Sequence, residues 1–297
     1  MTDRLLGSGL IIVDKPTGMT SHDVISRLRR IFGTRRVGHA GTLDPMATGV
    51  LVVGIERGTR FLAHLVTETK TYRATIRLGA STTTDDAEGD ITSRTDTTDV
   101  TDTLIDAAIA QLTGDIMQKP AAVSAIKIDG KRAHERVRDG ETVDIPARPV
   151  TVHRFDVLDR RSVDGYIDLD VDVFCSSGTY IRSLARDLGN ALGVGGHLTA
   201  LRRTTVGPFD LTHARTLEEL EDNPQLSLTL DQALAASFPI LRVSGEEGHK
   251  LAMGQWLEPR GLEGIHAAVT PDGQAVALVK EKGKRLATVF VARPSTL

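Results

Sequence analysis

The stretch VGHAGTLDPMATGVL, Val37 to Leu51, decides how the rest of the chain is interpreted. It contains three glycines and few large side chains. Glycine lets a backbone approach its neighbours closely or adopt a positive φ, and a residue that precedes proline is held in an extended conformation. The stretch is therefore predicted to form a tightly shaped loop that presents one carboxylate, Asp44, and one imidazole, His39.

The loop leads directly into the apolar, β-branched run Val50–Val53, which is predicted to be a buried strand. A loop fixed to a buried strand is a suitable mount for a catalytic group. An aspartate before proline also often caps a turn. The residues alone therefore leave two interpretations of Asp44 open, a catalytic carboxylate and a structural cap.

Two motifs in the N-terminal part resemble one known family. The ungapped pattern G-H-x-G-x-L-D-P-x-A-T-G-x-L, matched from Gly38 to Leu51, resembles the signature loop of the TruB-type tRNA pseudouridine synthases. The pattern D-K-P-x-G-x-T-S, matched from Asp14 to Ser21, resembles the opening of the same family. The resemblance covers residues 9–210 well and the remainder weakly. It implies that Asp44 is the catalytic nucleophile of an isomerase that converts uridine 55 in the T loop of tRNA to pseudouridine.

A second informative residue is Arg182, in the first turn of a helix predicted to begin near Thr179. A helix macrodipole disfavours a cation at that end, so the position indicates a compensating anion, although a surface arginine that reaches water is the alternative. The segment Ser176–Arg182 resembles the family's G-T-Y-I-R sequence, whose arginine pairs with the catalytic aspartate. The resemblance therefore implies that Arg182 lowers the pKa of Asp44 and keeps it ionised.

The resemblance also gives roles to residues whose spacing has an ordinary explanation. Tyr72 lies on the apolar face of an alternating strand, so core packing is the default, but its family counterpart stacks on the extruded uracil and its hydroxyl is a candidate for proton transfer. His39 is implied in flipping the base or ordering the RNA loop. The remaining implied substrate contacts are Lys15 and Pro16 in the pocket wall, Tyr180 under the base, and Leu201.

The implied reaction breaks the N-glycosidic bond, turns the uracil in its pocket and joins C5 to the ribose C1′. Asp44 acts on the sugar, and the sequence leaves a covalent route and a glycal route both open. No electrons move and no group is donated, so we expect neither a metal nor an organic cofactor. The substrate loop is expected to be recognised by its shape and its flipped bases.

The charges are segregated along the chain, which has a formal net charge of −3. Residues 81–106 hold eight acids and one base, residues 27–36 hold five arginines and no acid, and residues 127–138 hold five bases and two acids. Local positive surface attracts phosphates, although ordinary solvated helix faces would show the same pattern. The resemblance implies an RNA-gripping insertion at about 115–150, with RNA contacts from Lys127, Lys131, Arg132, Arg136 and Arg138.

The hydrophobic patterns predict a mixture of strands and helices. We expect strands at 9–14, 70–78, 123–128, 150–158 and 166–175, and helices at 20–33, 58–66, 102–112, 131–138, 179–192 and 246–253. Residues 81–101 and 216–227 are predicted to be exposed connections, and Pro271-Asp272-Gly273 to be a hairpin turn.

The family resemblance organises these elements into an α+β fold. It implies a mixed or antiparallel central sheet flanked by helices, the pseudouridine synthase fold, in a catalytic domain at residues 1–237. Residues 238–297 form a compact β-rich unit that resembles a PUA-like RNA-binding domain.

Composition excludes several other classes of protein. No apolar run approaches the roughly 18 residues of a membrane span. The N-terminus lacks the charged start, apolar region and cleavage site of a signal peptide, so we expect a cytoplasmic protein without membrane contact. We also expect a monomer that needs no obligatory protein partner. The single cysteine, Cys175, excludes an intramolecular disulfide, and its phase in an alternating strand favours a buried, inert thiol over a reactive one.

Two rival functions use the same features differently. A non-catalytic RNA-binding or RNA-folding protein needs basic surface and stacking aromatics, but has no use for a pair of Asp44 and Arg182. A glycosidase or nucleosidase usually needs two carboxylates that flank the bond, and only Asp44 stands in a shaped loop. An assay of uridine isomerisation on an unmodified tRNA transcript, without added metal or cofactor, distinguishes the three.

Overall fold

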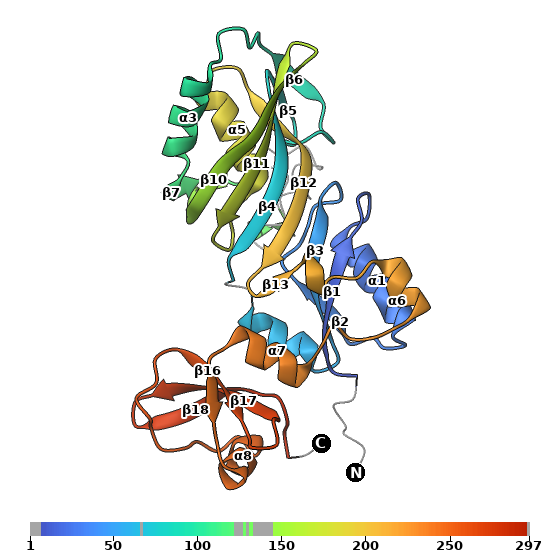
Figure 1. Ribbon diagram of the computed structural model, residues 1–297, viewed down its shortest axis with the longest axis vertical. Coiled ribbons are helices and arrows are strands. Elements are labelled where there is room, and N and C mark those ends of the chain that lie inside the picture. Colours follow the sequence, from blue (N-terminus) through green and yellow to red (C-terminus); the bar gives the residue numbers. More distant parts are fainter. Residues whose placement is uncertain (1–6, 66–67, 122–126, 129–130, 133–144, 296–297) are drawn as a thin grey trace. The chain divides into compact units, whose positions relative to one another are not determined.

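The computed structural model describes residues 7–65, 68–121, 127–128, 131–132 and 145–295 (Figure 1). The chain forms two compact units, each described here by itself. Unit 1 comprises residues 1–45, 49–66 and 205–297, and unit 2 comprises residues 46–48 and 67–204. No helix in the described part of the chain is long and apolar enough to cross a membrane.

Unit 1 is built on the strand β1 (Gly9–Lys15), which the sequence predicts from residue 9. β1 pairs along its whole length with β3 (Thr48–Ile55) in antiparallel register, and its other edge pairs with β14 (Leu228–Thr229). β2 (Val37–Ala40) pairs with β3. The signature stretch therefore begins in β2 and ends in β3, two strands of the same sheet.

Both faces of β1 are buried. Leu10 and Ile12 belong to one apolar cluster, and Ile11 and Val13 belong to another on the opposite face. Successive side chains of a strand point to opposite sides, so a strand between two cores needs an unbroken apolar run. This requirement explains the run of apolar residues that the sequence shows here.

Helix α1 (Ser21–Ile31) packs on the Ile11 cluster and begins as predicted. Thr20 and Asp23 form a capping box, in which each side chain binds the other residue's backbone N–H. α6 (Leu217–Asp222) contributes Leu217 and Leu220 to the same cluster, both fully buried.

The prediction that residues 216–227 form an exposed connection is therefore wrong at α6. A capping box between Thr216 and Glu219 starts this helix. Its two leucines are three positions apart on one face, and its acidic residues are exposed. The acidic residues of this segment correctly indicate one solvent-exposed side of a helix, but they do not indicate that the whole segment is exposed.

The C-terminal part of unit 1 is a four-stranded sheet in the order β15 (Ile240–Arg242), β16 (Ile265–Val269), β17 (Ala275–Lys282) and β18 (Arg285–Val291). Helix α8 (Gly245–Ala252) and the hairpin turn between β16 and β17 lie where the sequence predicts them. The β-rich character of this region is thus confirmed, while its identity as a separate domain stays a prediction.

Short helices complete unit 1. α2 (Gly58–Phe61) and a 3₁₀ turn at Leu62–His64 occupy the predicted helical segment after β3. α7 (Leu230–Ser237) shares an apolar cluster with β1 and with residues of β17 and β18. The Asp231 carboxylate also accepts bonds from the Ala275 N–H (2.7 Å) and the Arg293 guanidinium (2.6 Å).

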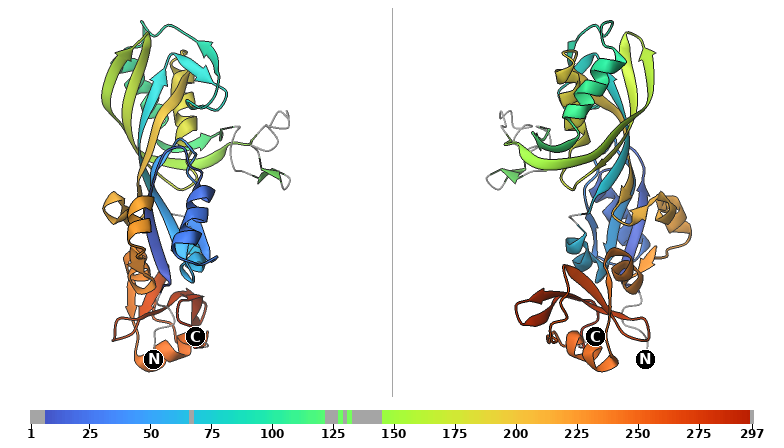
Figure 2. Two further views of the ribbon diagram at one scale, coloured as in Figure 1. Left: turned by 90° about the vertical axis from the view of Figure 1, so that its right-hand side faces the viewer. Right: turned by 60° about the vertical axis from the view of Figure 1, so that its left-hand side comes forward.

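Unit 2 is built on a second run of strands, β12 (Gly196–Val206), β4 (Lys70–Leu78), β11 (Tyr166–Cys175), β10 (Arg148–Val163) and β7 (Gly114–Gln118), in that order. The predicted pairing around the turn at Asp164 and Gly165 is confirmed, and both turn residues have positive φ (50° and 82°). Figures 1 and 2 show α3 (Asp102–Gln111) and α5 (Ile181–Ala191) against one face of this sheet.

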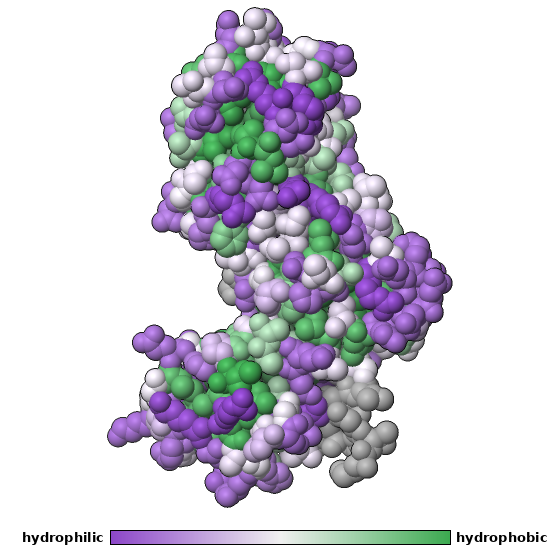
Figure 3. All heavy atoms as spheres, in the orientation of Figure 1, coloured by the Kyte–Doolittle hydropathy of each residue, from purple (hydrophilic) through white to green (hydrophobic). Residues whose placement is uncertain are grey.

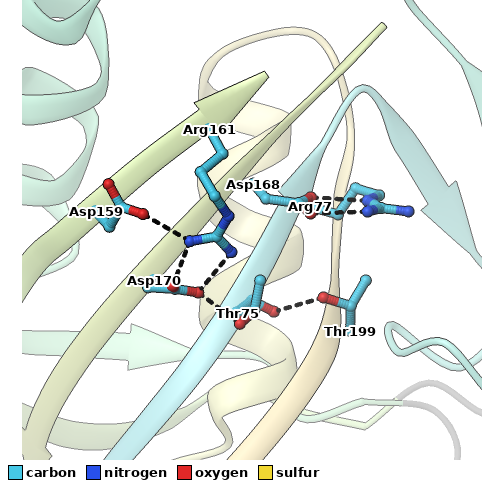
Figure 4. A network of polar contacts seen from close by, with 7 residues as sticks. All are labelled: Thr75, Arg77, Asp159, Arg161, Asp168, Asp170 and Thr199. Carbon is cyan, nitrogen blue, oxygen red and sulfur yellow. Dashed lines mark hydrogen bonds and ion pairs between the residues drawn. The ribbon is translucent and has the colours of Figure 1, made fainter. Parts of the chain in front are cut away.

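The opposite face of that sheet is polar, as the alternation in β4 predicts. Arg77 binds Asp168 through two bonds of 2.7 Å, and Arg161 binds Asp170, which also accepts a 2.7 Å bond from Thr75 (Figure 4). The Arg161 guanidinium lowers the pKa of Asp170, and Thr75 adds to this effect. The aspartates of β11 are therefore largely matched by arginines of unit 2.

Part of unit 2 is apolar at its surface. A hollow of about 410 Å³ lies between α3 and β10 and is lined by Ile105, Val157, Leu158 and Leu169 among charged residues. Figure 3 shows an apolar area over this unit.

Two predictions fail in unit 2. The segment 81–101 contains a hairpin of β5 (Ala80–Thr82) and β6 (Ile91–Arg94), and Asp86 within it is only 2% exposed. A basic helix does not begin at Lys131, because Lys131–Arg132 forms strand β9, paired with β8 (Lys127–Ile128). The predicted strand residues 123–126 and helix residues 133–138 lie outside the described residues.

We expect Gly189→Ala to destabilise the protein strongly. A Cβ atom at Gly189 in α5 would lie 2.1 Å from the backbone of Gly195 and Gly196, so helix or strand must shift, at a cost of about 1–3 kcal/mol. Gly245→Ala is the matched control, because nothing lies within 4 Å of that Cβ and alanine favours a helix by up to about 1 kcal/mol. Denaturant unfolding of both variants tests this, and equal stabilities would contradict it.

Candidate active site

The backbone on both sides of Asp44 is fixed by hydrogen bonds from the start of the chain. The buried Ser21 hydroxyl donates to the Leu43 carbonyl (3.1 Å) and accepts from the Leu43 N–H (2.9 Å). The Gly18 N–H donates to the Pro45 carbonyl (2.8 Å). The Asp44 side chain itself is half-buried. The predicted shaped loop is thus confirmed, and it holds Asp44 between two anchored neighbours.

Lys15 lies beneath this loop and is fully buried. Its Nζ donates to the carbonyls of Pro16 (2.8 Å) and Pro45 (3.2 Å). A buried ammonium group is stable only where oxygen atoms replace its water. Lys15 therefore joins the end of β1 to the Asp44-Pro45 step, and it brings together three of the predicted site residues, Lys15, Pro16 and Asp44.

His39 is the fourth predicted site residue in unit 1. It lies in β2 opposite Val53 of β3, five positions before Asp44, and it is half-buried. The strand pairing fixes its backbone, so His39 and Asp44 are held at the two ends of one short segment.

The remaining predicted site residues belong to unit 2. Tyr72 lies on the inward face of β4, opposite Val173, and is 7% exposed. Leu201 in β12 is also buried, at 8%. The burial of Tyr72 agrees with a packing role, and its role in stacking on a base stays a prediction.

Tyr180 is the N-cap residue of α5, and its backbone is clamped by Gln118 of β7. The Tyr180 N–H donates to Oε1 of Gln118 (2.8 Å), and Nε2 of Gln118 donates to the Tyr180 carbonyl (3.1 Å). Gln118 is 1% exposed, so both of its polar atoms are used in the protein interior. The sequence analysis did not find Gln118, because one glutamine at the end of a strand carries no distinctive pattern.

Arg182 follows in the first turn of α5 and is 5% exposed. Its Nη1 donates to the Thr84 carbonyl (3.1 Å) and lies 3.5 Å from Oδ2 of Asp86. The other oxygen of Asp86 accepts bonds from Oγ1 of Thr84 (2.5 Å) and from the Glu88 N–H (3.0 Å). A buried carboxylate thus accompanies this cation, and the pairing of Arg182 with Asp44 stays a prediction.

The burial of Asp86 is not apparent from the sequence, where this residue lies in an acidic segment predicted to be an exposed loop. The available signal was the run of three threonines before Asp85 and Asp86, since hydroxyl groups bind nearby backbone groups and fold such loops. Arg186, one turn after Arg182, binds Asp85 (3.1 Å) and the Lys119 carbonyl (2.7 Å). Burial raises the pKa of the Asp85 carboxyl, and the charges of Arg186 and Arg182 oppose this rise.

Two more buried polar groups, opposite each other in the sheet, lie where β4 begins and β11 ends. Lys70 is 8% exposed, and its Nζ donates to the Glu68 carbonyl (3.1 Å) and to the Ser177 hydroxyl (3.4 Å). Burial, and then the charge of Arg203, lower the pKa of Lys70. Cys175 is fully buried and burial raises its pKa to about 11, which confirms the predicted inert thiol.

The predicted basic surfaces differ from a simple positive patch. Arg27 binds Glu221 through two bonds (2.7 and 2.8 Å) and lies 3.2 Å from Glu218, so it is matched by α6. Among the predicted RNA contacts, Lys127 is in β8, and Lys131 and Arg132 are in β9. Arg136 and Arg138 lie outside the described residues.

In the part of the chain that the structure describes, no three His, Cys, Asp or Glu side chains are placed to hold a metal ion.

Family models match the chain in three consecutive segments. The TruB family pseudouridylate synthase (N terminal domain) model matches residues 29–181. The tRNA pseudouridylate synthase B C-terminal domain model matches residues 182–236, and the tRNA Pseudouridine synthase II, C terminal, model matches residues 238–293.

Similar proteins match almost from end to end. A protein of Corynebacterium efficiens is 72% identical over 100% of both chains. One of Nocardia farcinica is 60% identical, with 97% of this chain and 94% of its own covered. One of Rhodococcus jostii is 56% identical, with 99% and 96% covered. All three are named tRNA pseudouridine synthase B.

Two solved structures share the fold. A structure of an H/ACA RNP bound to a substrate RNA containing 2′-deoxyuridine has a chain that is 26% identical, with a TM-score of 0.72 over 96% of this chain and 85% of that one. A Cbf5–Nop10–Gar1 complex has a chain that is 27% identical, with a TM-score of 0.73 over 98% and 87%. The α+β architecture is thus the pseudouridine synthase fold, as the sequence predicts. Within that class, the chain belongs to the TruB family of pseudouridylate synthases.

We expect Gln118→Leu to loosen the start of α5. The change removes the bond from the Tyr180 N–H to Gln118 and one of the two bonds to the Tyr180 carbonyl, which also accepts from the Leu184 N–H (3.2 Å), at a cost of about 1–3 kcal/mol in the free energy of unfolding. Gln118→Glu keeps the acceptor but buries a carboxylate against the Tyr180 carbonyl oxygen, so it should destabilise the protein as well. Denaturant unfolding and amide exchange at residues 180–182 measure both effects. Gln111→Leu, at an exposed position in α3, is the control, and equal behaviour of the two leucine variants would refute the clamp.

Proposed function

We propose that this protein converts uridine 55 in the T loop of tRNA to pseudouridine, with Asp44 as the catalytic carboxylate. The observation that carries the proposal is the loop around Asp44, whose backbone is bonded at Leu43 and Pro45 within the family's signature sequence. The names of relatives 56% to 72% identical support tRNA as the substrate.

The chemistry requires one group that acts on the sugar while the base is outside its stack. The bond from C1′ to N1 breaks, the uracil turns, C5 bonds to C1′, the proton on C5 is removed, and N1 gains a proton, so that the product is an isomer of the substrate. A half-buried carboxylate suits both routes for this exchange, attack on C1′ and formation of a glycal. Extruding the base costs a few kcal/mol, which contacts in the pocket must offset.

The other residues take roles around this centre. Arg182 keeps the carboxylate of Asp44 charged, and Tyr72 stacks on the flipped uracil, which contributes roughly 1–3 kcal/mol. His39 assists in flipping the base. The wall of the pocket consists of Lys15, Pro16, Tyr180 and Leu201. The basic residues that hold the RNA are Lys127, Lys131, Arg132, Arg136 and Arg138.

We expect Asp44→Asn to abolish product while the fold and the affinity for tRNA are kept, because an amide cannot act as an anionic group on the sugar. Pseudouridine formation on an unmodified tRNA transcript, filter binding of the same RNA and thermal unfolding measure the three properties. Asp99→Asn, at an exposed position, is the matched control. Near-normal product from Asp44→Asn would refute the proposed mechanism.

We expect Arg182→Lys to lose at least about tenfold in rate at saturating tRNA, because lysine lacks the planar, two-pronged contact of a guanidinium with a carboxylate. Affinity for tRNA should change by less than about twofold, because the proposed partner of Arg182 is the Asp44 carboxylate and not a phosphate of the RNA. Single-turnover rates and binding are compared with those of Arg154→Lys, which lies on the polar face of the sheet. If Arg182→Lys kept its single-turnover rate but bound tRNA more weakly, Arg182 would instead be assigned to a contact with a phosphate of the RNA.

A further inference from the structure

The C-terminal sheet carries an exposed aromatic side chain with a cation against it. Trp256, the single tryptophan of the chain, is 45% exposed. The guanidinium carbon of Arg285 lies 4.8 Å from the centroid of its ring, within the range of a cation–π contact. A large ring left this open to solvent, and stacked with a planar cation, is typical of surfaces that bind another flat group.

Backbone pairing explains why these two side chains meet. Leu257 and Leu286 exchange both backbone hydrogen bonds (3.0 and 2.8 Å), and both side chains belong to the apolar cluster beneath the sheet. Neighbours along a strand face opposite sides. Trp256 and Arg285 each adjoin one of these leucines, so both face away from that cluster.

Lysines lie on the same face of the sheet. Lys282 is directly opposite Arg285 in the hairpin of β17 and β18, and Lys280 is opposite Ala287. Residues directly opposite one another share a face. Lys280 and Lys282 are exposed, as is Lys284 in the turn. We call the surface formed by Trp256, Lys280, Lys282 and Arg285 the Trp256 surface.

Among the residues that the structure describes, no carboxylate forms an ion pair with the basic side chains of this surface. Glu281, the acid between the two lysines, faces the other side of the hairpin and accepts bonds from the N–H groups of Arg260 (2.7 Å) and Leu262 (3.3 Å). Glu258 follows Trp256 closely in the chain, and among the described residues it forms no ion pair with Arg285. The surface is therefore both aromatic and positively charged.

We propose that the Trp256 surface binds an unpaired nucleotide of the RNA substrate. The base stacks with Trp256 and Arg285, and the flanking phosphates lie against Lys280 and Lys282. Every base has a flat face that stacks on an aromatic ring, whereas phosphates need only nearby cations, so the binding does not depend on the base. The proposal rests on the proposed function, because it takes RNA as the substrate, and it adds a second contact outside the loop around Asp44.

The single tryptophan provides a direct test without any variant. Titrating the whole protein with a short oligoadenylate should give a saturable loss of tryptophan fluorescence, with a midpoint that moves to higher RNA concentration as salt is added. An oligoglutamate peptide is the comparison for charge alone. Unchanged fluorescence with bound RNA, or an equal loss with the peptide, would overturn the proposal.

Variants then test whether the surface contributes to binding of the substrate. Trp256→Ala should weaken binding of an unmodified tRNA transcript by about fivefold or more, the lower end of what one stacked base contributes, and Trp256→Phe should remain within about twofold. Ile240→Ala, at a 50% exposed position in the edge strand β15, is the control. Equal affinities for Trp256→Ala and Ile240→Ala would refute the proposal. Pseudouridine formation by the unaltered protein is measured separately, so this failure is distinguishable from a failure of the proposed function.

Discussion

The need to satisfy a buried ammonium group fixes the loop on which the proposed chemistry depends. The ladder between β1 and β3 places Lys15 opposite Gly49, near the end of the signature stretch, in a position with no access to water. An unpaired buried charge costs several kcal/mol, so the Lys15 ammonium must find oxygen atoms nearby. It binds the Pro45 carbonyl, and this contact ties the loop to the end of β1. Asp44 is restricted by the same contact, because its backbone is bonded directly to Pro45.

A similar constraint organises the start of α5. Arg182 is buried where the helix dipole already disfavours a cation, and the hairpin loop after β5 supplies the Asp86 carboxylate and the Thr84 carbonyl. Gln118 fixes Tyr180, two positions before Arg182, by binding both the N–H and the carbonyl of its backbone. The acidic segment that looks like a solvated loop in the sequence is thus part of the support of a buried arginine.

Local patterns could be predicted from the sequence, and long-range burial could not. The alternation in β4 and the capping box at Thr20 involve neighbours along the chain, and both predictions are confirmed. Asp86 and Leu220 are buried by partners that lie far away in the chain. Asp86 is covered by Arg182, and Leu220 packs in the Ile11 cluster. Their surroundings in the sequence are acidic, which indicates exposure. The loop around Asp44 could be predicted because a long ungapped motif defines it, whereas Gln118 belongs to no motif.

Net charge is a poor guide to where this protein attracts an anion, because many of its acids form ion pairs with cations of the same chain. Asp168 and Asp170 bind Arg77 and Arg161 on one sheet face, and Glu221 binds Arg27. In the described part of the chain, no carboxylate forms an ion pair with the lysines of the β17–β18 hairpin. Paired charges largely cancel a short distance from the surface, whereas unpaired ones act over roughly a Debye length, about 8 Å at physiological salt. A chain with a formal charge of −3 can therefore still carry a local positive surface, and the surface proposed to bind RNA lies where its single tryptophan is exposed.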